Sequence, residues 1–486
     1  MQAGIKAAGN GEPAVLLFLS TYVIIKLYNM KKIRTEEDLM GHDIIVFIPI
    51  IILITSALIT KKIAEPMFFA SVAAAVILYG KNFFTGYVEM IYGTLSNESY
   101  QFVMIMLMCF GGLIKILQES GAMLGFADLV SRRLKGPKSA LLVAALLTLV
   151  TFVDDYISVL TTPFVMRETT DRCGIPREHL AHQTNTLAGS FCVLIPFSSW
   201  TAFTVGLMSE QGFGYDDYVA SIPFMFYPII ASAICLLMIP GAFPKVGMMK
   251  KAYLRVAEGG EALNEKTENS IIDIEMPENT TPSGAMNAIV PIAVLMIVTM
   301  IYDNSLVYGI IAAIVVSAIM YISQKIMTPG GFFSLFFEGA KSMCTMAIII
   351  CFAFMLSSAN KELGFFEILI GGIGGTLPGW TLPLLAFVLV GATVFATGGY
   401  WLTQVIAIPI FLPLAQAMDV NPALVIGAMM SGVIFGFNTC LYADPVFLIS
   451  AGTGLNNFSL VRNSMPYALI AAVVSAVFYI VAGIVL

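Results

Sequence analysis

The chain has 486 residues, of which 58% are hydrophobic and only 12% are charged, and its formal net charge is −6. A soluble protein carries roughly twice that charged fraction, so the composition excludes an ordinary soluble domain and predicts a polytopic helical membrane protein. The 7 cysteines form no CxxC pair, and no Walker A or Rossmann glycine motif occurs. We therefore expect no disulfide framework, no zinc site, no enzymatic chemistry and no cofactor.

The first apolar segment covers residues 14–30 and is followed by a cluster of lysine and arginine. No small-residue cleavage site follows it, so we expect a retained anchor helix and a cytoplasmic N-terminus, with residues 1–42 forming an anchor and linker. Spans at about 43–60, 66–80 and 101–118 come next. The basic segment 131–138 then places the chain in the cytoplasm.

Two adjacent acids, Asp154 and Asp155, lie between the apolar arms 140–150 and 157–166. Neither arm reaches the roughly 17 to 25 residues that a spanning helix needs, and basic loops flank both. These features predict a re-entrant hairpin that enters from the cytoplasm, with its tip at 153–158. Such exposed backbone is tolerated in a membrane only where it lines a cavity within the protein.

The acidic pair predicts an ion site. One charged side chain at the bilayer centre costs about 2.5 to 3.5 kcal/mol, so Asp154 and Asp155 must face a cavity, a cation or each other. Adjacent acids in a low dielectric bind protons as a coupled pair, so a proton can replace a cation there. The structural alternative is a helix N-cap or a hydrogen bond that stabilises the hairpin turn.

A broken helix is expected at 183–208, because Pro196 removes a helical hydrogen bond and Ser198 and Ser199 can satisfy freed groups or ligate an ion. The polar connector before it contains His179 and His182, which we expect to be solvated.

A span at 219–243 returns to the cytoplasm. The polar stretch that follows, 244–285, is expected to be a cytoplasmic linker, which separates a first transmembrane repeat at 43–243 from a second at 286–486.

The second half gives the same order of elements again, at a spacing of about half the chain. We expect spans at 286–302, 306–324 and 340–357, a glycine-rich stretch at 365–375, hairpin arms at 382–395 and 405–414 around Gly398-Gly399, a broken helix at 423–450 and a closing span at 465–486. The predicted fold is an all-α inverted repeat. Each half has about three spans, a re-entrant hairpin, a broken helix and a closing span, and the N-terminal helix is extra. This is a transporter plan, although channels also use re-entrant loops.

The second broken helix supplies three more candidate site residues, Asn438, Thr439 and Asp444. Hydroxyl, amide and carbonyl oxygens are suitable ligands for Na⁺. The structural alternative is that these side chains, like Ser198 and Ser199, cap the broken helix ends.

Four segments resemble the central motif of the NhaC-type sodium/proton antiporters, which belong to a larger ion-transporter superfamily. They are Phe152–Tyr156, Met166–Asp171, Arg177–Ala181 and Cys192–Trp200. The resemblance implies cation/proton exchange, and some relatives move organic acids or amino acids. It also shows a departure in the second broken helix, where Phe437 and Asn438 replace an acid and a histidine, while Asp444 matches the family's final acid.

We therefore predict a secondary active transporter in the cytoplasmic membrane that exchanges Na⁺ for H⁺ by alternating access. The expected partners are the lipid bilayer and a small cation, with a small organic solute and a homodimer as further options and no nucleic acid. The predicted site consists of Asp154, Asp155, Ser198, Ser199, Asn438, Thr439 and Asp444. The alternatives are a Na⁺- or H⁺-coupled carrier of a small organic acid or amino acid, and a membrane protein without transport activity.

Overall fold

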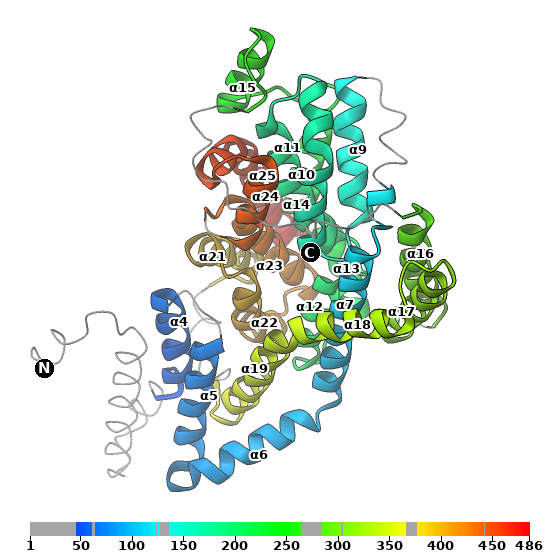
Figure 1. Cartoon of the computed structure of the whole chain (residues 1–486). Helices are drawn as coiled ribbons and strands as arrows, with labels where there is room; N and C mark the ends of the chain where they lie inside the picture. Colours follow the sequence, from blue (N-terminus) through cyan, green and yellow to red (C-terminus); the bar gives the residue numbers. More distant parts are fainter. Residues whose placement is uncertain are drawn as a thin grey trace, which may run out of the picture. The chain divides into compact units, whose positions relative to one another are not determined.

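The computed structural model describes residues 45–60, 64–122, 124–126, 136–263, 283–302, 305–365, 377–441 and 443–486. Every regular element within these ranges is a helix, which confirms the predicted all-α class (Figure 1). The predicted anchor helix at 14–30, most of the basic segment 131–138 and nearly all of the glycine-rich stretch 365–375 lie outside the described residues.

The chain forms two compact units, each built from both halves of the sequence. The first unit comprises residues 1–101 and 345–378, and the second comprises 102–344 and 379–486. The predicted repeats at 43–243 and 286–486 follow the chain order instead, and this division stays a prediction.

The first unit contains α4 (Ile48–Thr60), α5 (Ala64–Tyr79), α6 (Phe83–Leu95), the first residues of α7 (Glu98–Glu119) and most of α19 (Cys344–Glu362). Hydrogen-bond and ring contacts join α19 to the rest of this unit. The Tyr100 hydroxyl donates to the Ala347 carbonyl at 3.2 Å, and the rings of Phe68 and Phe352 meet edge to face with centroids 5.6 Å apart. Helix α6 has only 13 residues, fewer than a membrane-spanning helix needs, so a search of the sequence for spans does not predict it.

The second unit contains the candidate site. Its helices are the rest of α7, α9 (Pro137–Val150), α10 (Asp155–Arg172), α11 (Arg177–Leu194), α12 (Ser199–Ser209), α13 (Tyr215–Ser221), α14 (Phe226–Met238), α15 (Gly247–Ala257), α16 (Met286–Ile301), α17 (Leu306–Ser323), α18 (Pro329–Ser342), α21 (Leu382–Thr397), α22 (Tyr400–Ala417), α23 (Pro422–Thr439), α24 (Asp444–Thr453) and α25 (Asn457–Val485).

In the described part of the chain, 8 helices are long and apolar enough to cross a membrane, or up to 10 if each bent pair is one span. The protein is therefore a multi-pass membrane protein, as the composition predicts.

The first predicted hairpin is present as a helix, a turn and a helix. Helix α9 has 14 residues, shorter than a span. Helix α10 has 18 residues and continues to Arg172 through polar positions, so the prediction that its arm ends at 166 is wrong. Backbone hydrogen bonds extend α10 beyond the point where its apolar residues end. Entry from the cytoplasm stays a prediction.

The predicted broken helix is also present, since α11 and α12 are bent by 49° at the interruption. The next element differs from its prediction, because α13 with the short 3-10 helix η3 (Ile222–Phe224) is bent by 53° relative to α14. Pro223 lies in η3, where a ring without an N–H interrupts helical hydrogen bonding. The region of the predicted span at about 219–243 is therefore a bent helix pair, which is long and apolar enough to cross a membrane if the pair is one span.

In the second half, α21 and α22 meet at Gly398-Gly399, and Gly398 closes α21 with a left-handed φ of 69°. Helix α22 starts at Tyr400, earlier than the predicted 405, and both helices are long enough to cross a membrane by length and composition. Helix α25 starts at Asn457, so the predicted start at 465 is wrong. Its first two turns are polar, and Asn456 caps them with its side chain.

The order of elements recurs along the chain. Tyr156 and Tyr400, which follow the two hairpin turns, are 244 positions apart. The starts of α10 and α22 are separated by about the same number of positions, and so are the starts of α12 and α24. Helices α6 and α18, neither of which the sequence predicted, are related in the same way. The internal repeat in element order is therefore visible, whereas the opposite orientation of the halves stays a prediction.

Helices α21 and α23 pack closely because α23 presents glycine to α21. A Cβ atom on Gly432 would lie 2.6 Å from the Phe387 carbonyl oxygen and 2.9 Å from the Gly391 nitrogen, both backbone atoms of α21. Backbone atoms cannot give way without moving the helix that carries them.

We predict that Gly432→Ala separates α21 from α23 and destabilises the fold by about 1 to 3 kcal/mol, the usual cost of overpacking. The measurement is the midpoint of thermal unfolding in detergent. Gly330→Ala is the matched control, because Gly330 is exposed and its added Cβ meets nothing within 4 Å. Equal midpoints for the two variants would contradict the close contact.

Candidate functional site

The acidic pair lies at the start of α10, where the chain turns back after α9. Asp154 is 3% exposed and Asp155 is 0% exposed. Asp154 has extended backbone and is the N-cap of α10, since its Oδ1 accepts a hydrogen bond from the Tyr156 N–H at 3.0 Å. The structural alternative of capping is thus present for Asp154, but it occupies only one of its two oxygens.

The second oxygen of Asp154 joins the turn to the first broken helix. The Ser199 hydroxyl donates to Asp154 Oδ2 at 2.7 Å, and the Ser199 N–H donates to the Val153 carbonyl at 2.9 Å. The start of α12 is therefore fixed to the turn through both side chain and backbone. Two helix N-termini, those of α10 and α12, meet at the acids, and their dipoles favour negative charge there.

Asp155 is held by a residue that was not among the predicted site residues. The Trp200 indole Nε1–H donates to Asp155 Oδ1 at 2.8 Å. The other oxygen, Oδ2, is buried and meets no side-chain donor among the residues that the structure describes. Trp200 follows Ser198-Ser199 in the family motif, and that proximity is the only sequence signal for its role.

Two tyrosines connect the pair to the second half of the chain. The Tyr156 hydroxyl donates to Asp444 Oδ2 at 3.3 Å, and the Tyr400 hydroxyl donates to the Tyr156 hydroxyl at 3.1 Å. The starts of α10, α22 and α24 are thereby brought together. Asp444 is exposed, and the N-cap position of α24 belongs to Ala443, so Asp444 does not act as the predicted cap.

Aromatic rings lie beside the acids. Trp200 and Tyr400 stack with centroids 5.2 Å apart and an interplanar angle of 2°. The Phe437 ring meets both of them edge to face, with centroid distances of 5.9 Å to Trp200 and 5.3 Å to Tyr400. Phe437, which replaces the acid of the family motif, is therefore part of an apolar wall next to Asp155.

The structure separates the predicted site residues into two groups. Asp154, Asp155, Ser199 and Asp444 belong to the network around the turn. Ser198 caps α12 by accepting from the Thr201 N–H at 3.1 Å. Thr439 donates to the Phe435 carbonyl of its own helix at 2.7 Å, and Asn438 donates to the Tyr227 hydroxyl at 3.2 Å.

We predict different effects for the two neighbouring serines. Ser199→Ala removes the donor to Asp154 and lowers transport about tenfold, the equivalent of a charge-assisted hydrogen bond of roughly 1.5 kcal/mol. Ser198→Ala removes a helix cap and lowers stability by about 1 kcal/mol. Transport rate and thermal midpoint, measured on both variants, separate these roles. Equal loss of transport without loss of stability in both would contradict the assignment.

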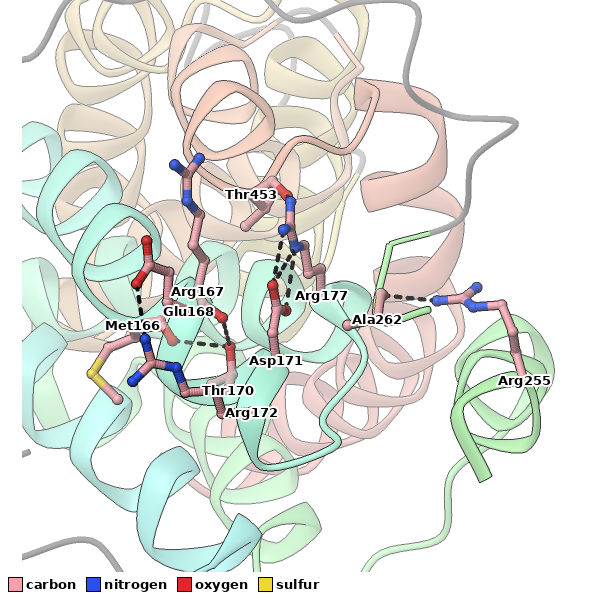
Figure 2. A network of polar contacts seen from close by, with 10 residues as sticks. All are labelled: Met166, Arg167, Glu168, Thr170, Asp171, Arg172, Arg177, Arg255, Ala262 and Thr453. Carbon is pink, nitrogen blue, oxygen red and sulfur yellow. Dashed lines mark hydrogen bonds and ion pairs between the residues drawn. The ribbon is translucent and has the colours of Figure 1, made fainter. Parts of the chain in front are cut away.

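A second polar network fastens the far ends of these helices (Figure 2). The Arg177 guanidinium at the start of α11 donates to Asp171 Oδ2 from Nε at 3.0 Å and from Nη2 at 2.8 Å. Its Nη1 donates to the Thr453 carbonyl at the end of α24 at 3.0 Å. Arg255 on α15 donates to the Ala262 carbonyl at 2.9 Å. The network thus ties α10, α11 and α24 together.

Helix α15 also covers the start of α11, so the prediction of solvated histidines is wrong. His179 and His182 are both buried. His179 Nδ1 is hydrogen-bonded to the Tyr253 hydroxyl of α15, and His182 Nδ1 is 3.1 Å from the Ser464 hydroxyl of α25. The Lys245 ammonium lies 3.2 Å from the centroid of the Tyr253 ring, and burial lowers its pKa. Part of the predicted linker 244–285 is therefore a packed helix.

Arg177→Gln is expected to lower stability by about 1 to 2 kcal/mol, because Asp171 and the Thr453 carbonyl both lose their donor. Solvent partly screens this ion pair, because the Arg177 and Asp171 side chains are 20% and 25% exposed, so the loss of stability stays in this range. Arg172→Gln is the control, because its pair with Glu168 is 82% and 73% exposed at 3.6 Å. Thermal unfolding in detergent measures both, and an equal effect of the two changes would contradict the role of Arg177.

A multi-pass helical fold with broken helices that meet at a buried acidic pair defines a membrane transporter, and not an enzyme. Residues 191–484 match the sequence model of the Na⁺/H⁺ antiporter family. The chain belongs to this family, which confirms the resemblance seen in the sequence. The acidic pair precedes the matched region, whereas the broken helix at Ser198-Ser199 and the second hairpin lie inside it.

The chain is 28% identical to an uncharacterized protein of Haemophilus influenzae over an alignment of 436 residues, which covers 82% of this chain and 81% of that protein. Two solved transporter structures share its fold. The YdaH transporter of Alcanivorax borkumensis aligns with a TM-score of 0.59 and 13% identity, over 80% of this chain and 86% of that one. MtrF of Neisseria gonorrhoeae aligns with a TM-score of 0.50 and 11% identity, over 83% and 85%. The protein is accordingly a secondary transporter.

Proposed function

We propose that the protein exchanges Na⁺ for H⁺ across the cytoplasmic membrane, with its N-terminus in the cytoplasm. The observation that supports this most strongly is the Asp155 carboxyl group, one oxygen of which is buried and has no side-chain donor in the described part of the chain. A buried carboxylate oxygen without a donor is unfavourable. Either a proton or a cation relieves that cost, and only one of them can occupy the oxygen at a time.

The proposed exchange uses the pair as the point of competition. With a proton bound, Asp155 is neutral and keeps its hydrogen bond from Trp200. When the proton leaves, the carboxylate attracts Na⁺, and Asp154, held by Ser199, contributes a second negative charge. The helix N-termini of α10 and α12 stabilise the charged state before the cation arrives.

Alternating access is proposed to arise from movement of the first hairpin and broken helix against the second. Among the contacts that such a movement must break are the hydrogen bonds of Tyr156 with Asp444 and Tyr400. Both involve hydroxyl groups at distances above 3 Å, so a small displacement exchanges them for water. Asn438 and Thr439 contribute oxygen ligands at the second break.

Proteoliposomes that contain the purified chain and a pH-sensitive dye inside test the proposal. An imposed Na⁺ gradient is expected to drive protons in the opposite direction, and equal gradients of K⁺ or choline are expected to drive much less. Empty liposomes and a protonophore provide the controls. Proton movement that does not depend on Na⁺ would contradict the proposal.

A second candidate is a Na⁺- or H⁺-coupled carrier of a small organic acid or amino acid. The aromatic wall of Trp200, Tyr400 and Phe437 favours it, because rings beside a charged group suit a solute with an apolar body. The same proteoliposomes distinguish the two. Radiolabelled organic acids or amino acids that accumulate only with a Na⁺ or H⁺ gradient would support this candidate, and proton flux unaffected by any of them would support simple exchange.

A further inference from the structure

Two asparagines from the two halves of the chain meet inside the second unit, at the end of α23. Asn185 on α11 and Asn438 on α23 are both almost completely buried. The Asn185 Nδ2 donates to the backbone carbonyl of Asn438 at 2.9 Å. Asn438 in turn donates its Nδ2 to the Tyr227 hydroxyl at 3.2 Å. Both side-chain amides therefore use their nitrogens within the protein.

Among the residues that the structure describes, the side-chain oxygens of Asn185 and Asn438 are buried and have no hydrogen-bond donor. The orientation of the Asn185 amide is fixed, because a flipped amide would place its oxygen against the carbonyl oxygen of Asn438. The Asn185 Oδ1 is therefore a buried acceptor without a donor, on a side chain that is hydrogen-bonded to the end of α23. The Asn438 Oδ1 is the second candidate ligand, and its amide meets the Tyr227 hydroxyl, which can donate as well as accept.

The position of these oxygens favours a cation. Helix α23 ends at Thr439, so its last carbonyl groups and the negative end of its dipole lie at this break. Thr439 uses its hydroxyl hydrogen toward Phe435, which leaves its oxygen lone pairs available. A set of amide, hydroxyl and carbonyl oxygens without a carboxylate suits a monovalent cation such as Na⁺. A divalent cation would require carboxylates.

We propose that Asn185, Asn438 and Thr439 form a second Na⁺ site, separate from the acidic pair. The identity of the ion rests on the proposed function, whereas the existence of the site rests on the orphaned oxygens. None of its ligands titrates, so Na⁺ binds there without displacing a proton. The acidic pair then exchanges ions, and the asparagine site holds an additional Na⁺ at the junction of α11 and α23.

Equilibrium dialysis of the purified full chain with radioactive sodium, at constant ionic strength in choline chloride, tests the proposal. We expect two sodium ions per chain in the wild type and one in the Asp154→Asn/Asp155→Asn double variant. In the Asn185→Ala variant, one ion is expected to bind as in the wild type, and the affinity for the other is expected to fall about tenfold or more. Asn185→Gln keeps both an amide nitrogen and an amide oxygen and is expected to retain both ions.

Asn463→Ala is the matched control. Asn463 is buried, and its Nδ2 donates to the Ser459 carbonyl at 2.7 Å. Its Oδ1 has no donor among the described residues, as in Asn185. Unlike Asn185, it contacts its own helix, α25, and not the end of a broken helix. It is expected to bind two ions. Thermal unfolding of every variant verifies folding, and a variant that fails to fold is replaced by its conservative partner, Asn185→Gln or Asn438→Gln.

A wild-type chain whose single bound ion is lost in the double aspartate variant and kept in Asn185→Ala overturns the second site, as does a double aspartate variant that binds none or an Asn185→Ala variant with wild-type binding. These results are distinguishable from failure of the proposed function. Sodium-driven proton flux can be absent while two ions still bind, which would reject the exchange and keep the site. Sodium-driven proton flux by a wild type that binds a single ion at the acidic pair would keep the exchange and reject the second site.

Discussion

Asp155→Asn is expected to reduce Na⁺-driven proton transport about 100-fold or more in proteoliposomes. Asparagine has nearly the same shape and keeps an oxygen that can accept from Trp200, so the fold is expected to survive. The amide cannot release a proton or carry the negative charge that attracts a cation. Loss of a charge-assisted interaction of about 3 kcal/mol corresponds to a factor of this size.

Asp419→Asn is the control for this change. Asp419 is exposed and has a φ of 55°, a conformation that asparagine adopts as readily as aspartate. The same chemical substitution there is expected to leave transport and thermal midpoint unchanged. Wild-type transport by the Asp155→Asn protein, at equal amounts of reconstituted chain, would remove Asp155 from the mechanism.

Trp200→Phe is expected to have the second largest effect, a roughly 10- to 100-fold loss of transport. The change removes the hydrogen bond that the Trp200 indole donates to Asp155 Oδ1, which is the side-chain donor that the described structure gives this carboxyl group. An ionised carboxylate without a donor costs more than a protonated one, so the proton is held more tightly. The pH at which transport is half-maximal is therefore expected to rise, which a pH series in proteoliposomes measures.

Trp401→Phe separates this effect from a loss of aromatic packing. Trp401 packs against Trp200 with centroids 4.8 Å apart and against Phe203 at 4.6 Å, and within the described structure its role there is ring contact. The same substitution at 401 is expected to lower stability slightly and to leave the pH profile in place. A pH shift of equal size in both variants would show that packing, and not the indole N–H, sets the behaviour of Asp155.

The position of the acidic pair was predictable because charge is rare in apolar segments and therefore conspicuous. The helix before Asp154 is too short to span a membrane, and this too is visible in the sequence. The break at Pro196 follows from the missing N–H of proline. These features depend on neighbours along the chain, for which residue order is sufficient.

The partners across the fold were not predictable in the same way. Tyr156 and Asp444 are 288 positions apart, and no local pattern pairs them. Trp200 has the same sequence pattern whether its indole N–H meets Asp155 or packs in a core. His179 and His182 appeared solvated because the helix that covers them, α15, lies in a stretch whose polar composition indicates a linker.

Helix ends show the same limit. The start of α25 is polar, so an apolar criterion places it too late, although Asn456 caps the helix earlier. The close crossing of α21 and α23 at Gly432 depends on which helices meet, and a single sequence does not give that information.

The most direct measurement is proton release from the purified protein on addition of Na⁺ in weakly buffered detergent solution. If cation and proton compete at the acidic pair, the wild type is expected to acidify the solution on addition of NaCl but not of choline chloride. The Asp154→Asn/Asp155→Asn protein is expected to release no protons while remaining folded. Release from the double variant equal to that of the wild type, or binding of Na⁺ by the wild type without any release, would contradict competition at the pair.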